Sequence, residues 1–321
     1  MAQRGLTTAL RRAEVLATTY TTSRFATTPL GLVRRSFANI SLPRLDGYRA
    51  VLGIDGEGWR HADMMEGRYI AVTKAVLADV ARFERGIPIA LKWQARWEGH
   101  SARAANRVVA ASEYAARQVV ALYGVAREKV TVIPEPFDVI AWRRALPIVS
   151  RRPMVLAVGH MYARKNYQAL LRAWPLIARE AKEAELVLVG TGPEYAMLRR
   201  IAAELPSVRM PGHVPLAVLQ QLYASATVFC HPSRQENFGL SVVEAVSAGL
   251  QVVAKRIPAL VESVGDLDAV ELLDRLDPRT LADAVLRALH RIAGVTGRNE
   301  LLAARFDPGA IGARWHDVID S

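Results

Sequence analysis

The sequence predicts an α/β protein made of two Rossmann-like, doubly wound domains that face a cleft. Short runs rich in Val, Ile, Leu and Ala alternate with segments of helical periodicity, which is typical of βαβ units and parallel sheets. Pro134 and Pro136, followed by a basic segment that ends at Pro153, separate two such series and predict a domain boundary near residues 140–152. A length of 321 residues is enough for two domains. The expected domains therefore cover residues 1–145 and 153–305, with a closing helix at 306–319 that packs back towards the first.

The individual elements follow from the period of the apolar residues. Compact β-branched and aliphatic runs predict strands at Ala50–Ile54, Tyr69–Thr73, Arg107–Ala111, Val130–Ile133, Pro153–Val158, Glu185–Gly190, Thr227–Cys230 and Gln251–Ala254. Helical spacing predicts helices at Ala2–Arg12, Lys74–Arg85, Glu113–Tyr123, Tyr167–Ala181, Glu194–Glu204, Leu216–Ala224 and Ser241–Ala248. Because ligands bind beyond the carboxyl ends of such strands, the loops that follow strands are the places to search for a site.

The composition excludes several classes of protein. A hydrophobic fraction of 51% is too high for a disordered chain, and no run approaches the roughly 18 apolar residues of a membrane span. The single cysteine, Cys230, excludes a disulfide framework and a cysteine-rich metal site. Since it lies in the apolar run Thr227–Cys230, we expect it to be a small core residue.

The positive charge is concentrated in the first half of the chain. Residues 1–150 hold 22 Lys and Arg against 13 Asp and Glu, whereas residues 151–321 hold 20 against 18. Such a surplus attracts nucleic acid, anionic lipid or a phosphorylated acceptor, and the net charge alone does not choose among them. A basic nucleic-acid-binding protein therefore stays among the alternatives.

The first forty residues admit two interpretations. Six arginines, one acidic residue and four Thr pairs resemble the composition of an organellar transit peptide. The segment Glu14–Thr19, however, follows a basic helical segment as a short strand would in an α/β repeat. No apolar stretch typical of a secretory signal is present.

Two glycine-containing turns in the second half follow predicted strands. After Val158, Gly159 permits close backbone approach, and Arg164 and Lys165 lie where a helix begins, which favours an anion such as a diphosphate. A solvated basic turn is the alternative. Gly190 and Gly192 form a second such turn, which lacks the third glycine of a dinucleotide site and which could serve only a tight turn.

A third segment places two carboxylates around a glycine-containing loop. Glu236 follows a buried strand, and Glu244 lies one turn into the next helix, so the two could contact different parts of one ligand. Ser241 and Glu244 also match a capping box, in which Glu244 would satisfy a backbone N–H at the helix start. The two roles for Glu244 stay open, whereas for Glu236 a functional role is favoured.

With these motifs in place, the stretch from about Pro153 to Gly265 resembles the donor-binding domain of retaining GT-B glycosyltransferases, the family-four type (glycosyl transferases group 1). The carrying residues are Gly159, Arg164, Lys165, Gly190, Gly192, Pro193, Gly212, His213, Val214 and the Glu-x7-Glu motif that runs from Glu236 through Asn237, Phe238, Gly239 and Leu240 to Glu244. Weaker similarity covers Ser112–Tyr114, Tyr123–Val125 and Val132–Pro134 in the first half, and Phe306–Val318 resembles the closing C-terminal helix.

The resemblance implies a function and a set of roles. Lys165 with Arg164 would bind the donor diphosphate, Glu236 would contact the transferred sugar, and Glu244 would hold the ribose. The remaining donor-binding candidates are Gly159, Gly190, Gly192, Val214, Asn237, Phe238, Gly239 and Leu240. The implied enzyme is a retaining hexosyltransferase that moves a sugar from a nucleotide-diphosphate sugar to an anionic, glycan or lipid-linked acceptor in cell-envelope or exopolysaccharide glycan synthesis. It needs no cofactor and no metal, and it works in the cytoplasm or peripherally at the inner face of the membrane.

The chain also departs from the family pattern. His160 stands where the family usually has an arginine, and Arg256–Pro258 replaces a glycine pair before Glu262. Lys74 replaces an acceptor-domain histidine and is our acceptor-side candidate. The chain starts at what resembles the helix after the family's opening strand, so we expect a first domain that lacks this strand.

Several alternatives stay open. A truncated homologue could bind nucleotide sugar without transferring it, and a GT-B sugar-nucleotide epimerase would act on the donor without an acceptor. Asp266-Leu267-Asp268 matches an Asp-x-Asp metal motif only superficially, since it lies well after the donor motif. The seven histidines show no ligand spacing, and we expect His231 to be a packed residue at the end of a strand.

Overall fold

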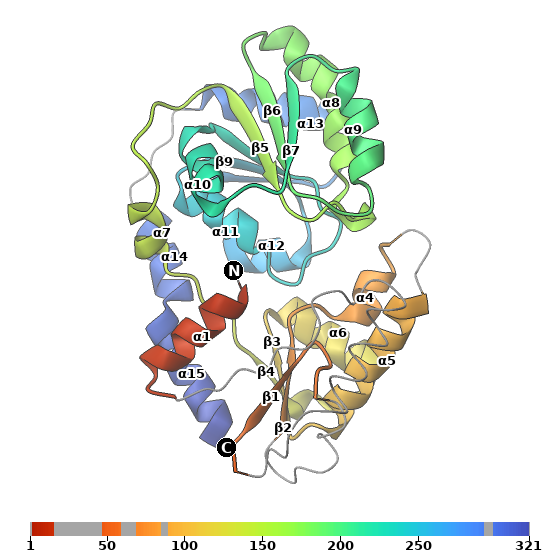
Figure 1. Ribbon diagram of the computed structural model, residues 1–321, viewed down its shortest axis with the longest axis vertical. Helices are drawn as coiled ribbons and strands as arrows, with labels where there is room; N and C mark the ends of the chain where they lie inside the picture. The colour runs from red at the N-terminus through yellow and green to blue at the C-terminus, as the bar shows by residue number, and fades with distance from the viewer. Residues whose placement is uncertain (1, 16–46, 59–68, 85–88, 292–297, 321) are drawn as a thin grey trace. The chain divides into compact units, whose positions relative to one another are not determined.

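The computed structural model describes residues 2–15, 47–58, 69–84, 89–291 and 298–320 (Figure 1). The chain divides into two compact units, one made of Met1–Phe137 with Pro308–Ser321 and the other of Asp138–Asp307. Each unit contains its own parallel β-sheet with helices packed against it. The chain enters the second unit at Asp138, slightly before the boundary expected near residues 140–152, because the helix Val139–Arg144 belongs to the second unit.

The second unit is a doubly wound sheet of six parallel strands among the described residues. The strands are β5 (Met154–Val158), β6 (Glu185–Val189), β7 (Val208–Gly212), β8 (Val228–His231), β9 (Gln251–Lys255) and β10 (Val270–Leu273). Their spatial order is β10-β9-β8-β5-β6-β7, so the direction of winding reverses between β5 and β8. A crevice at the carboxyl ends of the strands forms at this reversal, and it is the usual ligand site of such sheets.

The helices of this unit bury the central strands of the sheet. They are α7 (Val139–Arg144), α8 (Tyr167–Glu180), α9 (Tyr195–Ala203), α10 (Leu216–Ser225), α11 (Leu240–Ser247), α12 (Pro258–Val264), α13 (Pro278–His290) and α14 (Arg298–Phe306). Helices α8 and α13 pack side by side over β5, β6 and β8, with Leu170, Trp174, Ile177 and Leu281 fully buried between them (Figure 1). Strands covered on both faces read as continuous apolar runs, which explains why they were predictable from sequence. Cys230 belongs to this core, as expected.

The first unit holds a sheet of four parallel strands within the described ranges. The strands β1 (Val51–Ile54), β2 (Tyr69–Thr73), β3 (Arg107–Ala110) and β4 (Val130–Val132) lie in sequence order. The helices are α1 (Ala2–Arg12), α4 (Leu77–Ala81), α5 (Ile89–Ala104), α6 (Glu113–Tyr123) and α15 (Pro308–Asp320).

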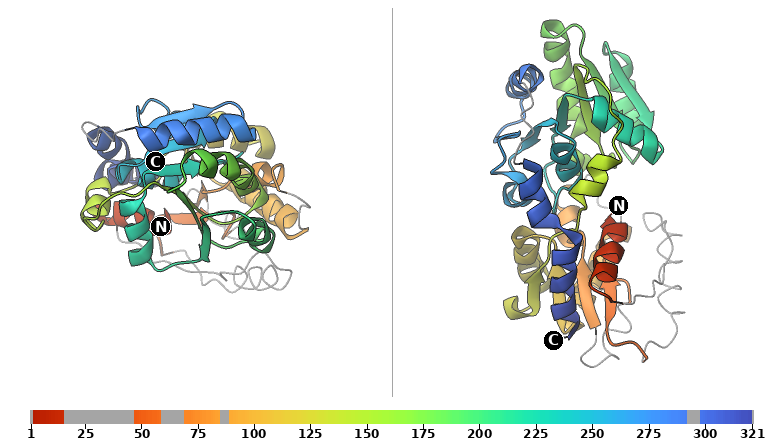
Figure 2. Two further views of the ribbon diagram at one scale, coloured as in Figure 1. Left: turned by 90° about the horizontal axis from the view of Figure 1, so that it is seen from above. Right: turned by 90° about the vertical axis from the view of Figure 1, so that its left-hand side faces the viewer.

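The C-terminal helix α15 joins the first unit by packing on α1 (Figure 2). A Cβ atom at Gly312 would lie 2.3 Å from the Ala9 carbonyl oxygen, so only glycine lets the two helices approach this closely. Trp315 and Ile311 of α15 are buried. The closing segment therefore packs on residues from the opposite end of the chain.

The structure adds elements that the sequence did not predict. Strand β7 contains Pro211 and alternates between half-buried and exposed residues, and only the last residue of β10 is buried, so neither edge strand shows a strong apolar run. Helix α5 buries polar side chains, which hides its periodicity. The helix expected at Lys74–Arg85 is shorter, at Leu77–Ala81. The strand expected at Glu14–Thr19 lies, beyond Val15, outside the described residues.

No helix in the described part of the chain is both long enough and apolar enough to cross a membrane.

The packing of α8 leads to a stability prediction. Replacing the fully buried Leu170 by alanine leaves a cavity in the core of the second unit, and we expect the free energy of unfolding to fall by about 2–5 kcal/mol in urea titrations. Leu216, on α10 of the same unit, is 48% exposed, and Leu216→Ala is the matched control with an expected change within about 0.5 kcal/mol. Equal losses in the two variants would contradict the observed burial.

Candidate functional site

Three turns crowd together at the carboxyl edge of β5, β6 and β7. The Gly190 N–H donates to the Gly212 carbonyl at 2.8 Å, and a Cβ at Gly190 would lie only 2.0 Å from the Gly159 carbonyl oxygen. A Cβ at Gly192 would lie 2.7 Å from the Met161 nitrogen. Gly159, Gly190 and Gly192 all have positive φ, so close approach and backbone conformation both require glycine here. The predicted glycine turns therefore pack against one another and form one continuous surface, which we call the glycine floor (Gly159, Gly190 and Gly192).

A short 3-10 turn, Ala163–Lys165, connects this floor to α8. Asn166 ends the turn in the left-handed conformation (φ 54°) that asparagine tolerates, and its side-chain amide donates to the Pro232 carbonyl at 3.3 Å. The Arg164 carbonyl accepts the Arg234 N–H at 2.8 Å, and the Arg164 guanidinium lies 4.8 Å from the centre of the Tyr162 ring. The turn after β5 is thus tied to the loop after β8.

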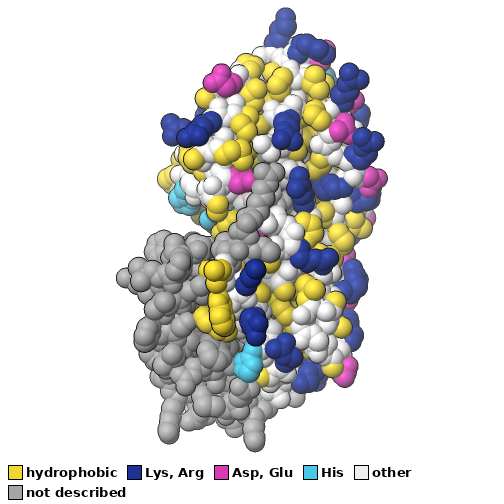
Figure 3. All heavy atoms as spheres, turned by 90° about the vertical axis from the view of Figure 1, so that its right-hand side faces the viewer, with side chains coloured by type: hydrophobic (Ala, Val, Ile, Leu, Met, Phe, Trp, Pro, Cys, Tyr) yellow, Lys and Arg dark blue, Asp and Glu magenta, His cyan; other side chains and the backbone are white. Residues whose placement is uncertain are grey.

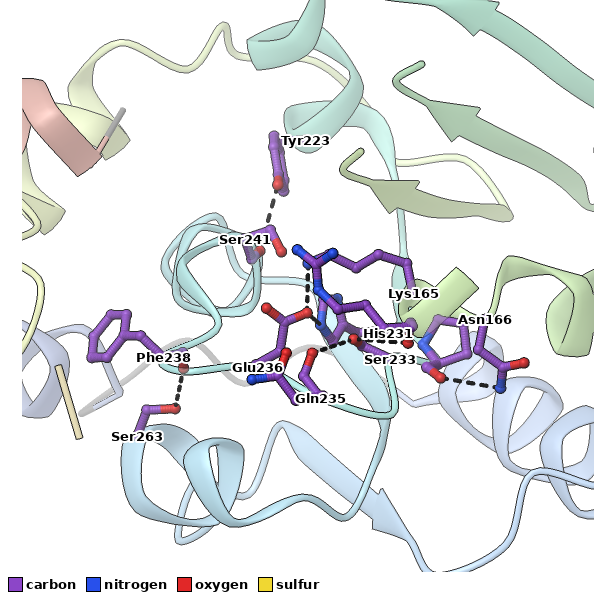
Figure 4. Close-up of polar contacts among 12 residues, drawn as sticks. Lys165, Asn166, Tyr223, His231, Ser233, Gln235, Glu236, Phe238, Ser241 and Ser263 are labelled. Carbon is purple, nitrogen blue, oxygen red and sulfur yellow. Dashed lines mark hydrogen bonds and ion pairs between the residues drawn. The ribbon is translucent and has the colours of Figure 1, made fainter. Parts of the chain in front are cut away.

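The tie brings Lys165 and Glu236 into contact across the reversal in strand order (Figure 4). Lys165 Nζ lies 2.5 Å from Glu236 Oε1, and His231 Nε2 lies 2.9 Å from the same oxygen. The side chains of Lys165 and Glu236 are only 13% and 12% exposed, and His231 is buried at the end of β8. His231 is packed at the end of a strand, as predicted. Sequence analysis missed its contact with Glu236. The position of His231 at the end of the strand was the only signal of this contact.

Opposing effects set the ionisation of this cluster. Burial disfavours the Glu236 carboxylate, but the adjacent Lys165 charge and the His231 hydrogen bond outweigh it and hold its pKa well below the usual range. Burial lowers the pKa of His231, although the hydrogen bond to Glu236 opposes the shift. Near neutral pH the cluster is therefore an ion pair with a neutral histidine, whose proton lies on the Nε2 that faces the carboxylate.

Glu244 does not form the predicted capping box. Helix α11 begins at Leu240 with Gly239 as its N-cap, so Ser241 already lies inside the helix. Gly239 has a φ of 90°, and a Cβ there would lie 2.3 Å from Leu260 Cδ2. Glu244 Oε2 instead accepts the Tyr223 hydroxyl at 2.9 Å. Burial raises the Glu244 pKa to about 7, although the Tyr223 hydrogen bond opposes the rise.

The remaining donor-side candidates lie around these charged groups. Asn237 Oδ1 accepts the Gln235 side-chain amide at 3.0 Å, which stabilises the loop. Phe238 is buried edge-on against Phe306 at 5.2 Å, and its carbonyl accepts the Ser263 hydroxyl at 3.2 Å. Leu240 opens α11 and Val214 follows β7; both are half-buried.

Lys74, the acceptor-side candidate, belongs to the first unit. Lys74 Nζ lies 2.7 Å from both carboxylate oxygens of Glu135, and Asp55 Oδ1 accepts the backbone N–H groups of Lys74 at 2.8 Å and Ala75 at 3.1 Å. Asp55, Lys74 and Glu135 each follow a strand of the same parallel sheet. Sequence analysis missed the two acids, although their positions after β1 and β4 were a usable signal.

Asp266 and Asp268 are each paired with an arginine. Asp266 accepts from Arg305 at 2.7 Å and Asp268 from Arg298 at 2.8 Å, and these hydrogen bonds lower the pKa of both carboxyl groups. Within the described ranges, no three His, Cys, Asp or Glu side chains gather closely enough to hold one metal ion.

Comparison with known proteins places this geometry in a family. Residues 152–291 match the family model described as glycosyl transferases group 1, and residues 80–140 match that of glycosyltransferase family 4. The chain is 34% identical over 238 residues to D-inositol 3-phosphate glycosyltransferase 2 of Catenulispora acidiphila, which covers 67% of this chain and 56% of the relative. It spans about half the length of the curated relatives that it matches.

Solved structures share the architecture. HepE of Anabaena, in a complex with UDP and glucose, superposes with a TM-score of 0.70 at 17% identity, covering 98% of this chain and 89% of HepE. WaaG, a glycosyltransferase involved in lipopolysaccharide biosynthesis, gives 0.69 at 15% identity, covering 99% and 95%. The predicted GT-B fold class is thereby confirmed.

The ion pair predicts a pH-dependent stability. Because the pKa of Glu236 is lowered by folding, its charge stabilises the native state above the unfolded pKa of about 4.3, and this contribution is lost as the pH falls further. We expect Glu236→Gln to lower the free energy of unfolding by about 1–3 kcal/mol at pH 7, and by progressively less as the pH falls below about 4. Urea titrations at several pH values measure this difference.

Glu183→Gln, on an exposed position of the same unit, is the control and should change stability by less than about 0.5 kcal/mol at every pH. A loss for Glu236→Gln that stays constant from pH 7 down to about pH 2.5 would show that its ionisation does not contribute.

Proposed function

Since the chain belongs to the family-four, group 1 glycosyltransferases, we propose that it transfers a sugar from a nucleotide-diphosphate sugar to an acceptor with retention of configuration. The observation that carries the proposal is the Lys165–Glu236 pair, which lies where the strand order reverses, beside the glycine floor. Lys165 offers a cation to a diphosphate, Glu236 offers a carboxylate to sugar hydroxyls, and the two groups are in direct contact. This is the pair of groups that a nucleotide sugar requires.

We propose that the donor spans the carboxyl edge of the second unit. Lys165, Arg164 and the N-terminus of α8 offer positive charge and N–H groups to the diphosphate. Glu236, with Asn237 to Leu240 on its loop, faces the sugar, and Glu244 accepts the ribose hydroxyls. Gly159, Gly190, Gly192 and Val214 line the path of the nucleotide. The HepE complex, which holds UDP and glucose, supports a nucleoside diphosphate donor.

The chemistry proposed for this arrangement is electrostatic. As the glycosidic bond breaks, negative charge develops on the leaving diphosphate, where Lys165, Arg164 and the helix N-termini of α8 and α11 stabilise it. The leaving phosphate oxygen takes the proton of the acceptor hydroxyl as this attacks from the same face. In this scheme, neither a dedicated base nor a metal ion is required.

On the acceptor side, we propose an anionic, glycan or lipid-linked molecule. The charge surplus of residues 1–150 and the relative named for inositol 3-phosphate both favour an anionic acceptor. Lys74 is the proposed contact in the first unit. We further propose that the protein works in the cytoplasm, peripherally at the inner face of the membrane.

The described residues on the face drawn in Figure 3 give no support to the nucleic-acid alternative. On the face drawn in Figure 3, Lys and Arg side chains of the described residues are scattered, with hydrophobic and acidic side chains between them. A nucleic-acid-binding surface would gather them into a patch or stripe.

The first test of the proposal is removal of the diphosphate cation. We expect Lys165→Ala to lower the transfer rate by about 100- to 1,000-fold, because one fixed charge at the leaving group is lost. The donor is first found with a panel of nucleotide sugars, and product is then followed by mass spectrometry with phosphorylated and neutral sugar acceptors. Lys182→Ala, on an exposed loop of the same unit, should keep full activity. Full activity in Lys165→Ala would disprove the role of Lys165.

The raised pKa of Glu244 leads to a second test. Ribose hydroxyls donate more strongly to an ionised carboxylate than to a protonated carboxyl. With a pKa of about 7, the Glu244 carboxyl is mostly protonated at pH 6 and mostly ionised at pH 8. Affinity for the nucleotide sugar should therefore rise about tenfold from pH 6 to pH 8, measured by calorimetry. A nucleotide sugar is used because its doubly esterified diphosphate does not titrate in this range.

Glu244→Gln should bind more weakly and without this pH dependence. A pH dependence that survives the substitution would have to come from another group and would remove Glu244 from the ribose site.

A further inference from the structure

Tyr167 buries a hydroxyl group that has no hydrogen-bond partner among the described atoms. It is the first residue of α8, two residues after Lys165, and it is 1% exposed. Two other tyrosines of the same unit do have partners: the Tyr195 hydroxyl donates to the Met210 carbonyl at 3.2 Å, and that of Tyr223 donates to Glu244. Since a buried hydroxyl without a partner is unfavourable, this one requires an explanation.

The hydroxyl points at Gly159, the glycine that follows β5. A Cβ atom on Gly159 would lie 2.8 Å from the Tyr167 hydroxyl oxygen, 3.9 Å from Lys165 Cε and 4.0 Å from Lys165 Nζ. The phenol and the ammonium group therefore border the same point, where a side chain at position 159 would collide with the Tyr167 hydroxyl. Glu236 and Arg164 are near enough for their charges to act on the phenol.

The phenol is a neutral group that can donate. Burial, with the added effect of the Glu236 charge, raises the pKa of Tyr167 far above its ordinary value, so the proton stays on the oxygen at any physiological pH. The neighbouring Lys165 ammonium already donates to Glu236. An anion that binds Lys165 next to Gly159 would offer oxygen acceptors to both groups at once.

We propose that Tyr167 is a further donor-binding residue, whose hydroxyl donates a hydrogen bond to the diphosphate beside Lys165. This inference rests on the proposed function of the site and adds a residue that the sequence motifs did not single out. A bound diphosphate would supply the acceptor that the hydroxyl lacks among the protein atoms described, and the new hydrogen bond would add to the affinity for the diphosphate.

A purely structural role does not explain the hydroxyl. Phenylalanine would fill the same volume among Leu170, Leu171 and the β5 side chains without an unsatisfied oxygen. The ring of Tyr167 therefore contributes to the core. Its hydroxyl group adds no hydrogen bond within the described protein, so phenylalanine would stabilise the fold equally well. If the hydroxyl had a structural role, its removal would lower stability and leave diphosphate affinity unchanged. If it binds the diphosphate, its removal lowers the affinity and leaves stability unchanged or higher.

The test is Tyr167→Phe, with binding of UDP, GDP and ADP and of their parent nucleosides measured by calorimetry. We expect affinity for the preferred nucleoside diphosphate to fall about 10- to 100-fold, as for a lost hydrogen bond to a charged group, with affinity for the nucleoside unchanged. The melting temperature without ligand should be equal or higher, because the unsatisfied hydroxyl is gone.

Tyr195→Phe is the matched control. It removes a tyrosine hydroxyl of the same unit that does have a partner, so it should lower the melting temperature and leave diphosphate affinity unchanged. Opposite signatures in the two variants distinguish ligand binding from general loss of packing.

Two results would overturn the inference, and they differ. Equal affinity of wild type and Tyr167→Phe for the diphosphate would remove Tyr167 from the site and leave the proposed function intact. If the wild-type protein bound none of the nucleoside diphosphates, the proposed function would fail, and the role of Tyr167 would fail with it.

Discussion

The proposed site of the second unit is organised around one partly buried ion pair, that of Lys165 and Glu236. Burying two charges costs desolvation energy, which is recovered only if the geometry is good and the remaining polar atoms are satisfied. Here His231 supplies a second donor to the same carboxylate oxygen. The pair can form only because β5 and β8 are neighbours, which in turn requires the order β10-β9-β8-β5-β6-β7. The fold and the site therefore depend on the same contact.

Steric room is the second requirement of this contact. The turn that carries Lys165 lies against the turn after β6, at distances where a Cβ on Gly190 would overlap the Gly159 carbonyl. Gly239 plays the same part for the loop that carries Glu236, because a Cβ there would collide with Leu260. Because these glycines have no side chain, the loops can approach one another closely, and this approach positions Lys165 and Glu236.

The sequence predicted those parts of the molecule that local pattern determines. Strands buried on both faces and the glycines of the turns after β5 and β6 were recognised, because apolar runs and turn residues leave a direct signal. The edge strands β7 and β10 were not, since their exposed residues weaken the run. The capping box, one of two roles left open for Glu244, does not form because the left-handed Gly239 is the N-cap of the helix. Contacts such as Lys74 with Glu135 join residues far apart in sequence, and no local pattern reveals them.

The ion pair also has a consequence for the proposed reaction. In the structure Lys165 neutralises Glu236, and a bound diphosphate would compete for the same ammonium group. If Lys165 turned towards the phosphates, Glu236 would keep the His231 hydrogen bond, which would hold the carboxylate in place for sugar hydroxyls. Because burial raises the pKa of Glu236 and the Lys165 charge is the largest effect that lowers it, loss of this contact would raise that pKa, and the His231 hydrogen bond would oppose the rise. In the proposed reaction, binding of the diphosphate and the state of the sugar-binding carboxylate are therefore coupled through a single lysine.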